Sequence, residues 1–112
     1  MAPVALTRSE TAALDEFCAW VRARFAGRVT QLALFGSRAR GEGTRESDLD
    51  VVVVVLGLTG AEAREIGHAA GDAMTNHDVL LSPFAVSEER MTELRDRERL
   101  IASEIARDAV PL

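Results

Sequence analysis

Residues 35–55 have the sequence FGSRARGEGTRESDLDVVVVV. The closing run of valines is typical of a strand that is buried on both faces, at the centre of a sheet. Asp48 and Asp50 stand at the start of that strand. Because strand side chains alternate between faces, both carboxylates should point to one side, with Cα atoms roughly 7 Å apart. Mg²⁺ is usually held by a few carboxylates together with substrate phosphates. This pair is therefore the candidate metal and catalytic site.

The polar half of the same segment contains groups that suit phosphate. Gly36 permits close approach of the backbone, and Ser37 offers a hydroxyl and an amide N–H to phosphate oxygens. Arginines can offset phosphate charge that metal ions leave over. The loop arginines are Arg38, Arg40 and Arg45. Ser47 completes the candidate nucleotide-binding set. Each feature alone is usually a turn, a solvated edge or a polar loop, but the combination predicts transfer of a nucleotidyl group.

Three strands are expected around this segment. Val29–Phe35 is mostly apolar, residues 48–56 form the central strand, and residues 78–86 form a third. Pro83 cannot donate a ladder hydrogen bond, so the third strand should lie at an edge or end there. Residues 36–47 contain three glycines and are expected to form a loop.

Helices are expected before and between these strands. Apolar residues at three- and four-residue spacing predict a helix with Ser9 as its N-cap, ending near Gly27. A second helix should begin at Thr59 or Gly60 and run to about Ala73.

The last part of the chain predicts further helix. Ser87 resembles a helix cap, and the apolar face that follows is interrupted by five charged residues at 95–99. This pattern allows either one solvated helix or two short ones. The order α-β-β-α-β-α predicts an α/β (α+β) domain, a small sheet with helices packed on it.

Composition excludes several classes of protein. The 112 residues fit one domain, and the formal net charge of -5 argues against non-specific binding to nucleic acid, because like charges repel. Cys18 is the one cysteine, which excludes a disulfide framework. No stretch reaches the roughly 20 apolar residues of a membrane helix, and the N-terminal residues show no secretory signal. We expect a soluble cytoplasmic protein with no membrane association.

Gly36-Ser37, followed ten residues later by Asp48-x-Asp50, resembles the signature of the DNA polymerase β-like nucleotidyltransferase superfamily. The string GSRARGEGTRESDLDVVVV is especially similar to the minimal nucleotidyltransferase branch, and the resemblance covers essentially the whole chain, 1–112. It implies a small mixed sheet flanked by helices. It also implies a Mg²⁺-dependent transfer of AMP from ATP to a tyrosine of a HEPN-type toxin, with this chain as the antitoxin. Assembly with the toxin or with a second copy is left open.

Carried over by residue, the resemblance implies that Gly36 and Ser37 hold the triphosphate and that Asp48 and Asp50 bind metal. The superfamily usually has a third carboxylate on the next strand, acting as general base. This sequence has Leu80 at the aligned position. Asp78 lies two residues earlier and would face the same way in a regular strand, so it is the candidate base. If Asp78 cannot reach, the alternative is an impaired enzyme that neutralises its partner by binding alone.

The acceptor must belong to another molecule if it is a tyrosine, because the chain contains none. A third interpretation is transfer to a nucleic acid or to a small molecule such as an aminoglycoside. The acidic charge weakens the first form, and the lack of an acceptor-binding domain weakens both.

Overall fold

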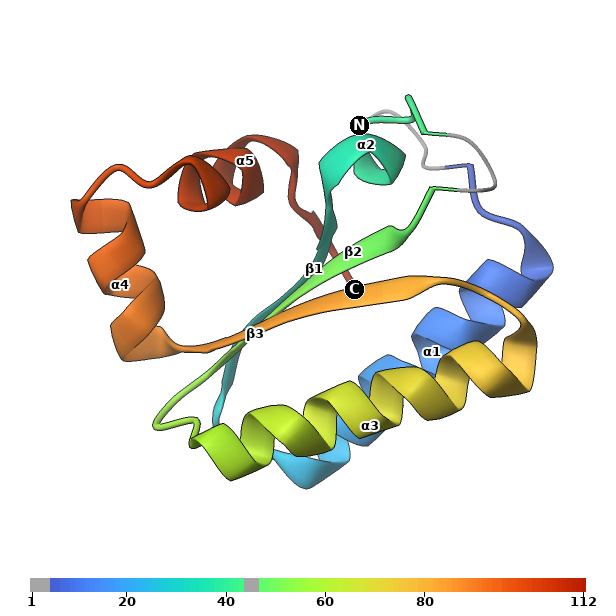
Figure 1. Ribbon diagram of the computed structural model, residues 1–112, viewed down its shortest axis with the longest axis horizontal. Helices are drawn as coiled ribbons and strands as arrows, with labels where there is room; N and C mark the ends of the chain where they lie inside the picture. The colour runs from blue at the N-terminus through green and yellow to red at the C-terminus, as the bar shows by residue number, and fades with distance from the viewer. Residues whose placement is uncertain (1–4, 44–46) are drawn as a thin grey trace.

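A computed structural model describes residues 5–43 and 47–112. Its centre is a four-stranded sheet in the order β3-β2-β1-β4 (Figure 1). The strands are β1 (Val29–Phe35), β2 (Leu49–Val55), β3 (Leu81–Ser87) and β4 (Val110–Pro111). β2 is antiparallel to β1 and parallel to β3, while β4 runs antiparallel to β1. The expected α/β fold with a small mixed sheet is therefore confirmed, and β2 lies inside the sheet as the valine run predicts.

Helices cover both faces of the sheet. The pair α1 (Arg8–Arg24) and α3 (Gly60–His77) packs on one face, and the pair α4 (Glu88–Asp96) and α5 (Leu100–Asp108) packs on the other (Figure 1). The short helix α2 (Gly36–Ala39) lies at the end of β1. None of the helices within residues 5–43 and 47–112 is long and apolar enough to cross a membrane.

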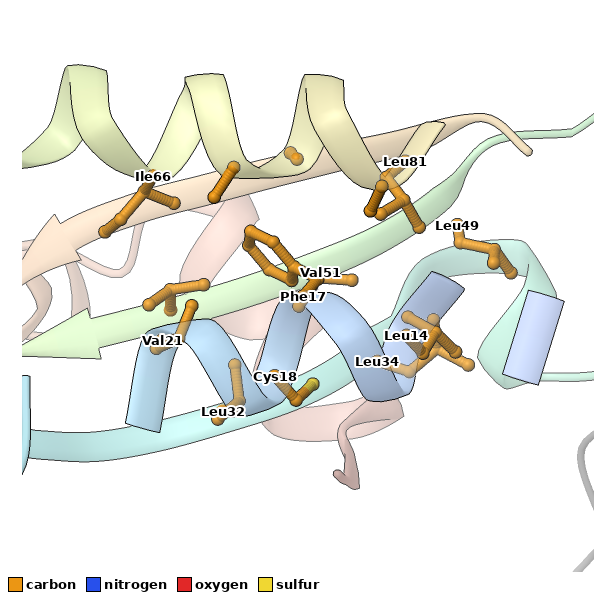
Figure 2. Packing of buried hydrophobic residues seen from close by; sticks show 14 of the residues in the cluster. Leu14, Phe17, Cys18, Val21, Leu32, Leu34, Leu49, Val51, Ile66 and Leu81 are labelled. Carbon is orange, nitrogen blue, oxygen red and sulfur yellow. The ribbon is translucent and has the colours of Figure 1, made fainter. Parts of the chain in front are cut away.

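The valines of β2 divide between two hydrophobic clusters. Val51, Val53 and Val55 join the cluster under α1 and α3, part of which is shown in Figure 2. Val52 and Val54 join the cluster under α4 and α5. All five are fully buried, which confirms the prediction of burial on both faces.

The first helix begins earlier than predicted. Its N-cap is Thr7, not Ser9, because Thr7 and Glu10 form a capping box: the Thr7 hydroxyl accepts from the Glu10 amide, and the Glu10 carboxylate accepts from the Thr7 amide. Thr59 and Glu62 form the same motif at the start of α3, which confirms one of the two predicted start points.

The third strand begins later than predicted. α3 continues past Ala73 to His77, and Asp78 ends it in the left-handed conformation at φ 53°, with its amide bonded to the Met74 carbonyl. Aspartate tolerates that conformation better than most residues. Strand β3 starts only at Leu81. Asp78 is therefore a helix cap, and the alternation of strand side chains does not apply to it.

One other boundary differs from the expectation, and one of the two alternatives for the C-terminal region is confirmed. The segment 36–47 is not all loop, since its first four residues form α2. The C-terminal helical region is two short helices, α4 and α5, with Glu98 at φ 52° between them. Pro83 lies on β3, which is one of the two outer strands of the sheet, as expected.

Candidate active site

The carboxylates of the Asp-x-Asp motif lie where β2 begins. Leu49, between them, is fully buried in the cluster under α1 and α3. Asp50 has the opposite orientation along the strand, toward the side of α4 and α5, and is half-buried. Asp48 is exposed and immediately precedes the strand. In the sheet register, Asp50 is paired with Phe35 of β1 and Ser82 of β3.

Gly36 lies against the Asp50 carboxylate. It follows Phe35, the register partner of Asp50, and has a positive φ of 79°. A Cβ built on Gly36 would overlap Asp50 Oδ2. Glycine is therefore favoured here by the backbone conformation, and a side chain would displace the Asp50 carboxylate. The structure thus joins the two halves of the motif, the Gly-Ser pair and the Asp-x-Asp pair.

Ser37 is held in a tight turn beside this contact. Its carbonyl accepts hydrogen bonds from the amides of Glu42 at 2.9 Å and Gly43 at 3.3 Å. A Cβ on Gly43 would be 3.0 Å from Ser37 Oγ. The chain that follows α2 therefore folds back across Ser37, and the serine is half-buried at the edge of the site.

The pKa of Asp50 is raised above its ordinary value. Burial is the largest cause, followed by the negative charges of Asp48 and of Glu104 on α5. A carboxylate in this position is poorly stabilised when ionised, and a bound cation would relieve that repulsion. Two carboxylates near each other are oxygen donors that suit Mg²⁺, so these residues fit a divalent metal. No group of three His, Cys, Asp or Glu side chains within the described residues forms a more complete metal site.

Arg38 has a different place from the one the sequence suggested. Its guanidinium is buried and forms a two-pronged ion pair with Glu10 of α1, with N–O distances of 2.7 and 2.8 Å. It also donates to the carbonyls of Ala5 and Ser47. The donors of Arg38 point to protein oxygens in this structure, so contact of Arg38 with a phosphate stays a prediction.

Arg40 links α2 to the end of α5. Its Nη1 lies 2.6 Å from Asp108 Oδ2, and its Nε lies 2.9 Å from Glu42. Arg107 contacts the same Asp108 carboxylate. About a third of the Arg40 side chain is exposed. Arg40 therefore borders the site, with its guanidinium paired to Glu42 and Asp108. Arg45, the remaining arginine of the expected set, lies outside the described residues.

Asp78 lies on the wall of a cavity next to the site. The cavity measures about 750 Å³ and is lined by Ser47, Asp78, Leu80 and the N-terminal turn of α1. Leu80 is 54% exposed, and its carbonyl accepts from the amide of Leu49, between the two motif aspartates. The position at which the sequence resemblance leads us to expect a third carboxylate thus lies beside the Asp pair and holds an exposed leucine.

Three acidic residues contribute to this region without having been expected from the sequence. Glu104 adds negative charge near Asp50, Glu10 pairs with Arg38, and Asp108 pairs with Arg40. The spacing Thr7-x-x-Glu10 signals a capping box, but it does not reveal that the same carboxylate binds Arg38. Nothing in the local sequence marks Asp108 or Glu104.

A sequence model of the nucleotidyltransferase domain matches residues 18–104. The protein MJ0604 of Methanocaldococcus jannaschii, described as a candidate protein adenylyltransferase, is 41% identical over 46 residues. Those residues cover 41% of this chain and 46% of that protein, so the match spans about half the length of the relative.

Solved structures resemble the whole sheet and its helices. A structure described as a candidate minimal nucleotidyltransferase superposes with a TM-score of 0.64 at 25% identity, covering 95% of this chain and 97% of the other. A chain from the crystal structure of a toxin-antitoxin with AMP-PNP superposes with a TM-score of 0.57 at 16% identity, covering 85% and 68%. At that identity the second likeness concerns the fold alone.

Proposed function

This chain belongs to the nucleotidyltransferase family, and on that premise we propose that it transfers AMP from ATP to a hydroxyl group of a partner protein. The observation that carries the proposal is the contact between Gly36 and the Asp50 carboxylate. It unites a backbone segment able to approach phosphate with a carboxylate pair able to hold metal. The partial match to a candidate protein adenylyltransferase supports a protein as the acceptor.

In this proposal Gly36 and Ser37 hold the triphosphate, and Asp48 and Asp50 hold Mg²⁺. Bound Mg²⁺ would neutralise charge on the triphosphate and on the leaving pyrophosphate. The raised pKa of Asp50 supports the assignment, because its negative neighbours favour a cation at this position. Arg40 and Ser47 border the nucleotide, while Arg38 supports the loop from within.

The acceptor we propose is a tyrosine hydroxyl of a HEPN-type toxin, with this chain acting as the antitoxin. The sequence resemblance supports the toxin class. The toxin-antitoxin structure with the same fold is consistent with it. The acceptor oxygen attacks the α-phosphorus, the bond to the bridging oxygen of the β-phosphate breaks, and pyrophosphate leaves. We assign the hydroxyl proton to the Asp78 carboxylate. Strand alternation does not place Asp78 beside Asp50, so the assignment rests on its exposure to the cavity that Ser47 also lines.

A transfer assay tests this function directly. The chain, Mg²⁺ and α-labelled ATP are incubated with and without a HEPN-type partner, and the mass of the partner is recorded. We expect the partner to gain the mass of one or more AMP units. Asp50→Asn should lower the rate of this transfer at least about 100-fold. Asp72→Asn, on an exposed part of α3, is the matched control and should leave transfer unchanged. Full activity in Asp50→Asn would refute the metal assignment. Appearance of label in RNA or in an antibiotic would show that the acceptor is not a protein.

A second candidate function is neutralisation of the partner by binding without transfer. Leu80, 54% exposed next to the Asp pair, favours it, because no carboxylate occupies that position just before β3. Under this alternative Asp48→Ala still neutralises the toxin. A variant that binds the toxin but no longer neutralises it would exclude the alternative.

A further inference from the structure

Arg38 is the best-connected side chain near the candidate site, and it is buried. Its guanidinium binds both carboxylate oxygens of Glu10, at 2.7 and 2.8 Å, with the two side chains only 6% and 7% exposed. It also donates to the Ala5 carbonyl at 3.3 Å and to the Ser47 carbonyl at 3.5 Å. One side chain thereby contacts α1, the segment before α1, and the end of the loop that leads into β2.

The two ends of that loop carry the two halves of the site. Arg38 follows Ser37 directly in α2, and Ser47 directly precedes Asp48. The stem of Arg38 is also enclosed, because a Cβ on Gly43 would lie 2.5 Å from Arg38 Cδ. Gly43 therefore lies against the Arg38 stem, and the guanidinium contacts Ser47 at the other end of the loop.

From these contacts we infer that Glu10 and Arg38 form a positioning pair, which holds Ser37 and Asp48 in a fixed relation without touching the nucleotide. The inference rests on the proposed function for its effect on ATP, but not for its effect on the loop. Arg38 would thus affect phosphate binding indirectly, through the position of Ser37. A guanidinium that binds a carboxylate through two parallel hydrogen bonds is held in one orientation, so the pair can hold the two ends of the loop in one relation.

The chain offers a matched control for the pair. Arg28 and Glu62 form another two-pronged ion pair, at 2.8 and 2.9 Å, and Glu62 is also the capping-box glutamate of its helix, as Glu10 is. Arg28 precedes β1, at the opposite end of that strand from α2. Glu10→Gln and Glu62→Gln therefore each remove the charge of a two-pronged pair, one buried next to the candidate site and one more exposed and remote from it. Both glutamines keep an oxygen that can accept the cap amide.

The first measurement is amide hydrogen exchange of the free protein. In Glu10→Gln we expect exchange of residues 36–43 and 47–50 to rise at least about 10-fold, with no such change in Glu62→Gln. An unchanged loop in Glu10→Gln would overturn the inference. A rise spread evenly over all peptides would also overturn it, because it would show general destabilisation. This arm gives an answer whether or not the chain transfers AMP.

The second measurement is the rate of AMP transfer at varied ATP concentration, below the melting temperature of each variant. Glu10→Gln and Arg38→Gln should each lower kcat/KM for ATP by about 10- to 100-fold, because small displacements of reacting groups have effects of this size. The double variant should lose no more than either single one. Arg38→Lys, which keeps the charge without the fork, should show a similar loss. Loss in Arg38→Gln with full activity in Glu10→Gln would mean that Arg38 contacts phosphate, against the inference.

The two arms keep the two hypotheses apart. An inactive wild-type protein with a loosened loop in Glu10→Gln would refute the proposed function and support the positioning pair. An active wild-type protein with no difference between Glu10→Gln and Glu62→Gln in either measurement would support the proposed function and refute the positioning pair.

Discussion

The contact between Gly36 and Asp50 depends on a single missing methyl group. Glycine serves two purposes there, since its φ of 79° disfavours a side chain and the Asp50 carboxylate occupies the space that a Cβ would need. Gly27 has the same φ of 79° but no atom within 4 Å of a built Cβ. The two glycines allow the steric effect to be separated from the conformational one.

Gly36→Ala should weaken Mg²⁺-ATP binding by at least about 10-fold and lower the free energy of unfolding by about 2–3 kcal/mol. Gly27→Ala carries only the conformational penalty, about 1 kcal/mol, and should leave nucleotide binding intact. Titration calorimetry and urea unfolding would measure both. Equal effects of the two substitutions on ATP affinity would contradict the proposed role of Gly36.

The buried pair of Glu10 and Arg38 should make stability depend on pH in a specific window. The hydrogen bond from Arg38 lowers the pKa of Glu10 below its usual 4.5, so the folded state holds this proton less readily than the unfolded state. The contribution of the pair is then complete above about pH 4.5 and lost as the pH falls through the lowered pKa. Wild type should exceed Glu10→Gln by about 3 kcal/mol at neutral pH, and the gap should close in acid unfolding. A gap that widens in acid would contradict this sign.

Among the elements, β2 unites the core of the fold with the candidate site. Its five valines are fully buried, divided between the two faces of the sheet, and the motif aspartates stand at its start. The run of valines is sufficient to predict this strand. Adjacent strand residues point to opposite faces, so consecutive apolar residues indicate that both faces are buried.

Burial on both faces predicts that neighbouring valines are equally intolerant of a hydroxyl. Val52→Thr and Val53→Thr keep nearly the same shape, but each places a hydroxyl at a position with no exposed surface. Each should lower the free energy of unfolding by about 1–3 kcal/mol. Chemical denaturation of both variants measures this. A neutral effect of either one would show that its face of β2 is accessible to water.

Element boundaries were harder to predict than element types. Thr7 rather than Ser9 caps α1, because both residues can cap and only the reciprocal partner Glu10 decides between them. Asp78 was expected in a strand but ends α3, since an aspartate that accepts the left-handed conformation can prolong a helix to its own position. Neither outcome follows from periodicity.

Across the whole molecule, contacts within the local motif could be predicted from the sequence, whereas contacts between distant segments could not. The motif residues Gly36 and Asp50 were expected to cooperate, and the sheet register brings them into contact. Arg38 was expected at phosphate, but its partner Glu10 lies 28 residues away in the chain. Such long-range pairs depend on how α1 packs, which local patterns do not specify.

The single cysteine is a probe of the packing of the whole domain. Cys18 lies in α1 against the sheet, and burial raises the pKa of its thiol to about 11. The thiolate is the reactive form, so labelling of the native protein should be slow at pH 8 and should accelerate sharply in denaturant. The labelling rate followed by mass spectrometry should track the unfolding transition. Rapid labelling under native conditions would show that α1 separates from the sheet without global unfolding.

The complete burial of the valines of β2 also has a consequence for the energetics of ligand binding. A strand packed on both faces cannot shift without disturbing the core, so the backbone that carries Asp50 is rigid. A nucleotide that binds there would meet a surface whose shape is set in advance, and little ordering entropy would be lost by the strand itself.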